Sequence, residues 1–160
     1  MIELKEGTES IYIFNNFFNH NLCDHYAKQI NDLGEGNYDW DVRAKDITDN
    51  KKLINKVKKF FKKQLNVDLI IDQVQLQNWN VGTHSGLHRH QDPEKDGRRL
   101  TTINSIIYLN DDFEGGEFIT PSNSYKPKKG DLTFFNGYLL WHGLNQVKKK
   151  DRKSIIFWWQ

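Results

Sequence analysis

LIIDQVQLQNWN, residues 69–80, is the stretch at which the chain changes to strand periodicity. Successive side chains of a β-strand point to opposite faces of the sheet. From Ile71 onward, this rule places three glutamines on one face and Val74 and Leu76 on the other. Neither face is wholly apolar. The stretch therefore predicts a strand whose two faces meet different surroundings.

The chain downstream of this stretch carries several more strand patterns. β-Branched and aromatic runs predict strands at 100–109, 116–120, 131–136, 138–144 and 153–159. In FFNGYLL, residues 134–140, an Asn-Gly pair separates two apolar runs, which is typical of a hairpin with a two-residue loop. A second signal is Gly115–Gly116, for which we expect a tight turn with positive φ.

The chain upstream of residue 69 begins with one strand pattern, SIYIFNNFF at residues 10–18. Two helices should follow, each starting at a polar side chain that can accept a hydrogen bond from the first turn. The candidate caps and extents are Asn19 or Asn21 for a helix to about Asp32, and Asp49 or Asn50 for a helix over 51–65. The second helix has an apolar stripe opposite its lysines.

This order of elements predicts an α+β fold that is mainly β. We expect two or three N-terminal helices to support a double-sheet sandwich or jelly roll of antiparallel strands. No break in composition divides the 160 residues, a length that suits one hydrophobic core. The expected organisation is one domain over 1–160, with strand-plus-helix support over 1–68 and a β-core over 69–160.

Composition narrows the class of protein. A formal net charge of +2 does not indicate a nucleic-acid partner, and the lysine runs at 51–63 and 148–150 read as solvated surface. The single cysteine, Cys23, excludes an intrachain disulfide and a thiolate zinc site. Without a signal-like or membrane-spanning apolar segment, we expect a cytoplasmic protein without a membrane partner. The Asn- and Lys-rich composition would suit an AT-rich microbial or viral genome.

The stretch LHRHQDPEKDGRRLTT, residues 87–102, concentrates candidate metal ligands. His90 and Asp92 are two residues apart, so on a strand their side chains share one side. With His142 as a third ligand they would form the facial triad of non-haem Fe(II) oxygenases, which leaves positions open for substrates. The competing ligand set is a three-histidine, cupin-like site that includes His88, which also shares the strand face of His90.

Arg152 and Ser154 offer a receptor for a carboxylate. They are two residues apart in a predicted strand and so share a face. An arginine that enters an apolar segment needs an anion, and a guanidinium fork with a neighbouring hydroxyl binds a carboxylate well.

The order of motifs over residues 74–159 resembles the Fe(II)/2-oxoglutarate-dependent dioxygenases, in particular their prolyl 4-hydroxylase-like branch. The segments that carry the resemblance are HQD, RRLTTINSIIYLND, GGEF, PKKGDLTFF and WHGLNQVKKKDRKSIIFWW. The resemblance implies a double-stranded β-helix with His90, Asp92 and His142 as iron ligands. Arg152 would bind the distal carboxylate of 2-oxoglutarate, and Tyr108 would hydrogen-bond this cosubstrate. Ser154 is added from strand periodicity.

Other residues are candidates for the substrate side of the site. Arg98 and Arg99 follow a glycine-containing loop next to the expected iron, where a mobile loop could cover the substrate. Where relatives often have a tyrosine, about ten residues before the first iron-binding histidine, this chain has Trp79 between two asparagines. His88 would line the entrance of the cleft or donate a hydrogen bond.

The predicted Asn-Gly hairpin gives one further expectation. A two-residue loop at Asn136–Gly137 would pair Phe135 with Tyr138 and bring Asp131 opposite His142. The Asp131 carboxylate could then orient the iron-bound imidazole from outside the ligand set.

The resemblance implies Fe(II), 2-oxoglutarate and O2 as cofactor and cosubstrates, with ascorbate as a stimulant. The expected reaction hydroxylates a C–H bond, most simply of a peptidyl proline, with succinate and CO2 as coproducts. The expected partner is therefore a peptide or protein substrate. Two alternatives remain open: a nucleic-acid or free amino-acid oxygenase of the same chemistry, and a non-catalytic jelly-roll module that binds a metal or ligand.

Overall fold

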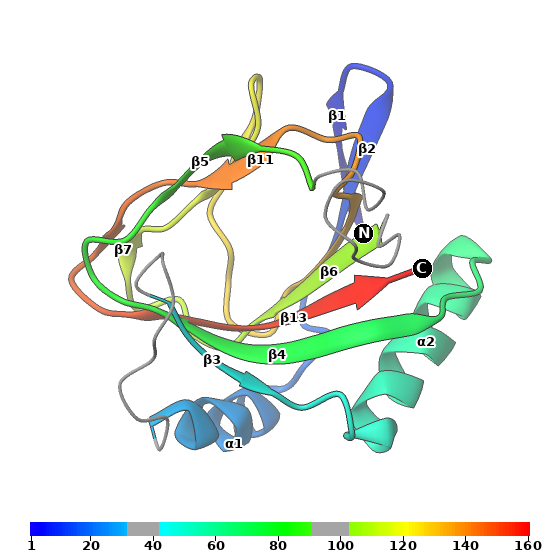
Figure 1. Cartoon of the computed structure of the whole chain (residues 1–160), viewed down its shortest axis with the longest axis horizontal. Coiled ribbons are helices and arrows are strands. Elements are labelled where there is room, and N and C mark those ends of the chain that lie inside the picture. The colour runs from blue at the N-terminus through cyan, green and yellow to red at the C-terminus, as the bar shows by residue number, and fades with distance from the viewer. Residues whose placement is uncertain (32–41, 91–102) are drawn as a thin grey trace.

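Two β-sheets face each other in the computed structural model, which describes residues 1–31, 42–90 and 103–160 (Figure 1). The large sheet has the strand order β1-β2-β10-β6-β13-β4-β3, and the small sheet the order β5-β11-β8-β9. A short ladder joins β12 to β7. The fold is a mainly β, jelly-roll architecture with antiparallel pairing, as the sequence predicted.

The elements have the following bounds. The helices are α1 (His20–Asn31) and α2 (Lys51–Leu65). The strands of the large sheet are β1 (Ile2–Glu6), β2 (Glu9–Phe14), β3 (Val42–Asp46), β4 (Ile71–Trp79), β6 (Ile103–Tyr108), β10 (Leu132–Asn136) and β13 (Arg152–Trp159). The remaining strands are β5 (Ser85–His88), β7 (Glu114–Gly115), β8 (Phe118–Ile119), β9 (Ser124–Tyr125), β11 (His142–Leu144) and β12 (Val147–Lys148).

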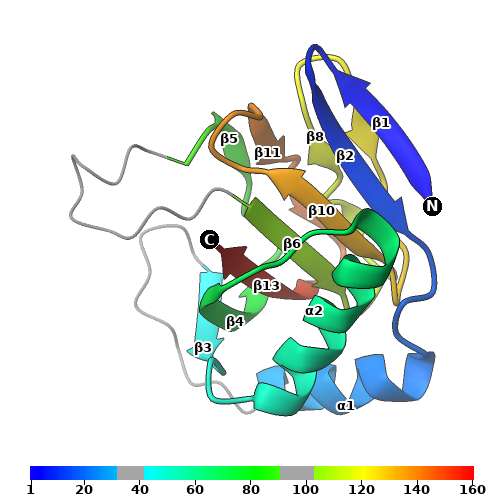
Figure 2. The same cartoon turned by 90° about the vertical axis from the view of Figure 1, so that its right-hand side faces the viewer.

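Both helices cover the outer face of the large sheet (Figures 1 and 2). Asn19 caps α1 by accepting a hydrogen bond from the Leu22 amide at 2.9 Å, and Asn50 caps α2 by accepting one from Leu53 at 3.1 Å. The predicted apolar stripe of α2 is buried through Leu53, Ile54, Val57 and Phe61. In the part of the chain that the structure describes, no helix is both long and apolar enough to cross a membrane.

The alternation of β4 separates two environments. Val74 and Leu76 are fully buried in the core shared with the helices. Gln75 and Gln77 lie on the other face, where Gln77 pairs with Ser154 of β13. This face of the large sheet points into the interior between the two sheets (Figure 1).

The first 68 residues contribute more to the sheet than predicted. Only 10–18 was expected as a strand, and it ends at Phe14, because Asn16 takes a left-handed φ of 56°. Strands β1 and β3 were missed. Both are edges of the large sheet and carry charged side chains, which protect an edge but hide its strand pattern.

The predicted two-residue hairpin at Asn136–Gly137 is wrong. Strand β10 pairs with β2 and β6 in the large sheet, whereas β11 pairs with β5 and β8 in the small sheet. The Asn136 side chain accepts hydrogen bonds from the amides of Tyr138 and Leu139, and its carbonyl accepts one from Leu140 at 2.9 Å. This longer turn carries the chain from one sheet to the other, so β11 begins only at residue 142.

The turn at Gly115–Gly116 has the positive φ angles that the sequence predicted, 64° and 61°. A Cβ on Gly115 would stand 1.9 Å from the carbonyl oxygen of Gln146, against which β7 packs. We expect Gly115→Ala to lower the free energy of unfolding by at least about 2 kcal/mol, through strain and collision together. Gly7 is the control, because its φ is 60° and nothing lies within 4 Å of an added Cβ.

Urea denaturation of the two variants measures this difference. Gly7→Ala should lower the free energy of unfolding by only about 1 kcal/mol, the cost of the left-handed conformation. Equal losses in both variants would contradict the close approach of β7 and Gln146.

Candidate metal and cosubstrate site

Three histidines meet where the small sheet joins β5 to β11. His88, at the end of β5, is the cross-strand partner of His142, at the start of β11. The ring of His142 lies 4.6 Å from that of His88 and 5.0 Å from that of His90, centroid to centroid. One donor atom from each lies within 4.8 Å of the others, so the three could hold a metal ion.

Backbone carbonyls orient two of these imidazoles. His142 Nδ1 lies 2.9 Å from the Leu140 oxygen, and His88 Nδ1 lies 2.9 Å from the Gly86 oxygen. A carbonyl can only accept, so each Nδ1 carries the proton and the lone pair is on Nε2. This is the arrangement that fixes the tautomer of metal-binding histidines in proteins.

His90 is held differently, by the turn that follows β10. Its amide donates to the Gly137 carbonyl at 2.8 Å. Its Nδ1 and Asn104 Oδ1 both lie close to the position that a Cβ on Gly137 would take, at 2.8 and 2.2 Å. Neither atom has a hydrogen-bond partner among the residues with described positions. Any larger residue at position 137 would therefore collide with the His90 imidazole.

Burial keeps two of the imidazoles neutral. It lowers the pKa of His142 to about 3 and is the main reason why the pKa of His90 falls to about 4, with the neighbouring His88 adding to the effect on His90. Neutral imidazoles are the form that binds metals.

These low pKa values predict an acid-sensitive metal-free protein. Between about pH 6.5 and pH 4 the unfolded chain binds protons at His90 and His142 that the folded chain does not, so stability falls as the pH drops. Denaturation of the metal-free protein at several pH values should show this slope, and His142→Phe should flatten it. If stability depended on pH as steeply in His142→Phe as in the wild type, the burial of a neutral imidazole at this position would be contradicted.

The structure brings together His90 and His142, which the sequence proposed as ligands, and also His88. Asp92 lies outside the described residues, as do Arg98 and Arg99 with the rest of 91–102. The described histidines therefore include His90 and His142, the two imidazoles of the facial triad. They also include His88, which completes the competing three-histidine set.

Arg152 is a buried cation at the start of β13, with 3% of its surface exposed. Its guanidinium carbon lies 4.9 Å from the centroid of the Tyr108 ring. Arg152 Nε and the Tyr108 hydroxyl both lack hydrogen-bond partners within the described part of the chain. Burial lowers the pKa of Arg152, but an arginine keeps its proton in proteins, so the guanidinium remains a cation. Burial raises the pKa of Tyr108, so its hydroxyl remains a neutral donor. An anion would satisfy both.

Ser154 and Trp79 flank this pair. Ser154 is buried and is the cross-strand partner of Tyr108, so the predicted shared face of Arg152 and Ser154 is present. Trp79 is the cross-strand partner of Arg152, and its indole donates to Gln77 at 3.2 Å. Trp79 therefore lies beside the buried guanidinium.

The histidines and the Arg152 pair border the same interior. Phe118 and Phe135 pack on the ring of His142, with centroids 5.8 and 4.9 Å away. Both belong to the buried cluster that also contains Tyr108. Buried aromatic side chains therefore connect the histidine cluster to Tyr108 at the cationic end of the site.

The expectation that Asp131 orients His142 depended on the hairpin register, and the structure corrects it. Asp131 instead accepts hydrogen bonds from Asn15 at 3.1 Å and from the Tyr125 hydroxyl. The Leu140 carbonyl, and not the Asp131 carboxylate, orients the His142 imidazole.

Sequence reasoning also missed polar residues that surround the candidate ligands. Asn104 beside His90 and Asp151 beside Arg152 are both in stretches that carried the resemblance. The available signals were a polar amide inside the expected strand 100–109 and a carboxyl group just before the expected strand 153–159. Only the long-range pairing of β6, β13 and β4 shows what these groups contact.

Comparison with known proteins identifies the family. The model of the 2OG-Fe(II) oxygenase superfamily matches residues 74–160, more than half of the chain. Prolyl 3-hydroxylase 2 of Homo sapiens is 40% identical over 62 residues, a match that covers 34% of this chain and 9% of that enzyme. The chain thus spans only a small part of that curated relative.

Solved structures share the fold. The viral collagen prolyl hydroxylase of Paramecium Bursaria Chlorella virus-1 superposes with a TM-score of 0.76 at 20% identity, covering 93% of this chain and 94% of that one. A Pseudomonas putida prolyl-4-hydroxylase gives 0.73 at 14% identity, with 96% and 93% covered. HygX of Streptomyces hygroscopicus, with nickel, 2-oxoglutarate and hygromycin B bound, gives 0.73 at 14% identity, with 93% and 82% covered. By its sequence match over residues 74–160, the chain belongs to the 2OG-Fe(II) oxygenase superfamily.

Proposed function

We propose that the chain hydroxylates a C–H bond with Fe(II) held by His90, Asp92 and His142. In this proposal Arg152, with Tyr108 and Ser154, binds the distal carboxylate of 2-oxoglutarate. The observation that carries it is the buried Arg152–Tyr108 pair, whose Nε and hydroxyl have no hydrogen-bond partner in the described part of the chain. Tyr108 shares a buried cluster with the two phenylalanines that pack on His142 of the histidine cluster. A non-catalytic binding module would not need an anion receptor beside a metal site.

Bound iron would couple the reduction of O2 to the oxidative decarboxylation of 2-oxoglutarate. The substrate C–H bond and 2-oxoglutarate are oxidised, one oxygen atom of O2 enters the hydroxyl group and the other enters succinate, and CO2 leaves.

The protein's own part is positioning and exclusion of water. The hydrogen bond from His142 Nδ1 to the Leu140 carbonyl would aim its Nε2 at the iron. The Arg152 fork would fix one end of the cosubstrate and so limit the orientations of its keto acid end. Phe118 and Phe135 keep the region around His142 apolar, which strengthens electrostatic contacts within it.

We infer that the substrate is a peptidyl proline. Support comes from the names of the similar proteins, which include a prolyl 3-hydroxylase, a collagen prolyl hydroxylase and a prolyl hydroxylase from Trichoplax adhaerens in complex with a peptide fragment. HygX, which shares the fold and binds hygromycin B, favours a small-molecule substrate as the second candidate. Ascorbate would act as a reductant that restores Fe(II).

Succinate release tests this function. Purified protein with Fe(II), 2-oxoglutarate and O2 should form succinate, and a proline-rich peptide should raise the rate and gain one oxygen atom by mass spectrometry. Hygromycin B and free proline serve as the competing substrates. Absence of succinate under all these conditions would contradict the proposed chemistry, whereas succinate without peptide hydroxylation would contradict only the substrate.

The identity of the third ligand gives a separate prediction. If Asp92 binds the metal, Asp92→Ala should weaken Fe(II) affinity by more than about a hundredfold, while His88→Ala changes it far less. In cobalt-loaded protein, each ligating imidazole should give one exchangeable, hyperfine-shifted N–H resonance. Two such resonances in the wild type support His90 and His142 with Asp92. Three resonances, lost in part by His88→Ala, would favour the three-histidine set instead.

A further inference from the structure

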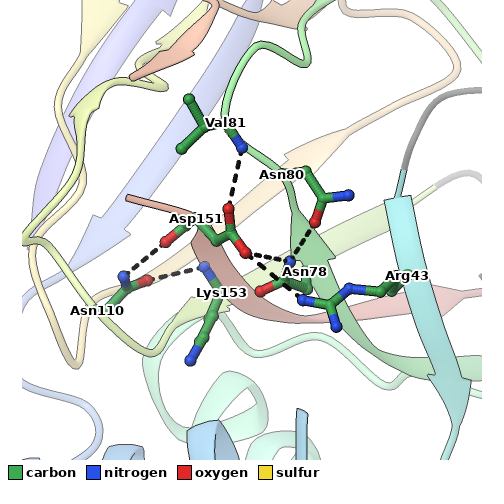
Figure 3. Close-up of polar contacts among 7 residues, drawn as sticks. All are labelled: Arg43, Asn78, Asn80, Val81, Asn110, Asp151 and Lys153. Carbon is green, nitrogen blue, oxygen red and sulfur yellow. Dashed lines mark hydrogen bonds and ion pairs between the residues drawn. The ribbon is translucent and has the colours of Figure 1, made fainter. Parts of the chain in front are cut away.

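Asp151 lies at the centre of a hydrogen-bond network around the residue that the proposed function assigns to 2-oxoglutarate (Figure 3). Asp151 immediately precedes Arg152, and its carboxylate accepts from the Val81 amide at 3.0 Å and from Asn78 Nδ2 at 2.9 Å. Arg43 of β3 adds an ion pair at 3.5 Å. One side chain therefore ties the start of β13 to the end of β4, to the turn after it, and to β3.

Asn110 completes the network from the opposite side. It lies two residues after Tyr108, and its Nδ2 donates to the Asp151 carbonyl at 2.9 Å. Its Oδ1 accepts from the Lys153 amide at 2.8 Å. The amide group thus binds the backbone on both sides of Arg152, as a neighbouring strand would do.

We propose that Asp151 and Asn110 are positioning residues that fix the Arg152 guanidinium for the cosubstrate. This rests on the proposed function, because it takes Arg152 as the anchor of 2-oxoglutarate. A buried guanidinium can bind a carboxylate with two parallel hydrogen bonds only when its plane is held in place. The network fixes the backbone on each side of that residue, and Asn110 also links it to the strand end that carries Tyr108.

The network has a second consequence for the site. Val81 lies in the segment that leads from β4 to β5, the strand that ends at His88. Asp151 therefore joins the backbone of the anion receptor to the backbone that leads to the metal-binding strand. We expect the distance between the two ends of the cosubstrate site to depend on this carboxylate.

We call the contacts of Asp151 and Asn110 around Arg152 the clamp. The test compares variants of these two residues with a matched control, in anaerobic protein loaded with Fe(II). Asp151→Ala and Asn110→Ala should raise the Kd and the KM for 2-oxoglutarate roughly 10- to 100-fold. The kcat at saturating 2-oxoglutarate and the Fe(II) affinity should change much less. Asp112→Asn is the control: Asp112 also accepts from Asn110, at 2.8 Å, but bonds to neither residue beside Arg152 in the described contacts. It should leave the Kd unchanged.

A double-mutant cycle separates positioning from a general loss of stability. If the clamp acts through Arg152, Asp151→Ala should add little to the Kd in a background of Arg152→Leu. Fully additive effects would overturn the proposal, as would an Asp151→Ala variant that loses thermal stability but keeps its Kd. If Asp151→Ala does not fold, the same cycle with Asn110→Ala decides. A wild type that binds no 2-oxoglutarate would refute the proposed function itself, whereas normal binding in both clamp variants would refute only the clamp.

Discussion

Replacing His142 with alanine is expected to abolish succinate formation and to weaken Fe(II) binding by well over a hundredfold. His142 is 6% exposed, and its tautomer is fixed by the Leu140 carbonyl, so its Nε2 is presented to the other imidazoles. Loss even of an outer partner of a ligand costs 10- to 100-fold in metal affinity, and loss of the ligand itself should cost more.

The control for this variant is His25→Ala, which removes an imidazole from an exposed contact with Gln29 in α1. It should bind Fe(II) and form succinate like the wild type. Metal affinity is measured by anaerobic titration, and circular dichroism shows that both variants are folded. Undiminished Fe(II) binding by folded His142→Ala would exclude this histidine as a ligand.

Replacing Arg152 with leucine should have the second largest effect. It should weaken the binding of 2-oxoglutarate without lowering the stability of the ligand-free protein. Arg152 is buried and has no acidic partner among the described ion pairs. A buried carboxylate left without its cation costs about 3–5 kcal/mol, which corresponds to a rise of about two to four orders of magnitude in the Kd for 2-oxoglutarate. Fe(II) affinity should be unchanged, because the histidines are intact.

The ligand-free Arg152→Leu protein should be at least as stable as the wild type. Removing an uncompensated buried charge and replacing it with an apolar side chain is neutral or stabilising in proteins. Arg152→Lys keeps the charge but loses the planar fork, so it should recover only part of the affinity. A strongly destabilised Arg152→Leu with normal 2-oxoglutarate binding would mean that Arg152 is structural and does not bind the cosubstrate.

The candidate ligand residues could be proposed from the sequence because they follow local spacing. His90 and Asp92 are separated by the strand period, and Arg152 and Ser154 by the same period. The order of these motifs then supplied His142 and the jelly-roll fold. The apolar stripe of α2 and the cap at Asn50 were equally local signals.

The contacts that were not predicted depend on distant pairing. Asn136–Gly137 has the local chemistry of a hairpin, yet Leu132 to Phe135 find better partners in β2 and β6, and the turn lengthens. The position of Asp131 was wrong for the same reason. The contact between Asn110 and Asp151 joins residues 41 positions apart, which no spacing rule could bring together.

The most direct test of the central claim is an anaerobic titration of the Fe(II)-loaded protein with 2-oxoglutarate, followed by visible absorption. Chelation of the iron by the keto acid should produce a charge-transfer band that saturates in the wild type. The band should require far more 2-oxoglutarate in Arg152→Leu and should be missing in His142→Ala. A wild-type protein that binds Fe(II) but shows no band at any concentration of 2-oxoglutarate would contradict the account.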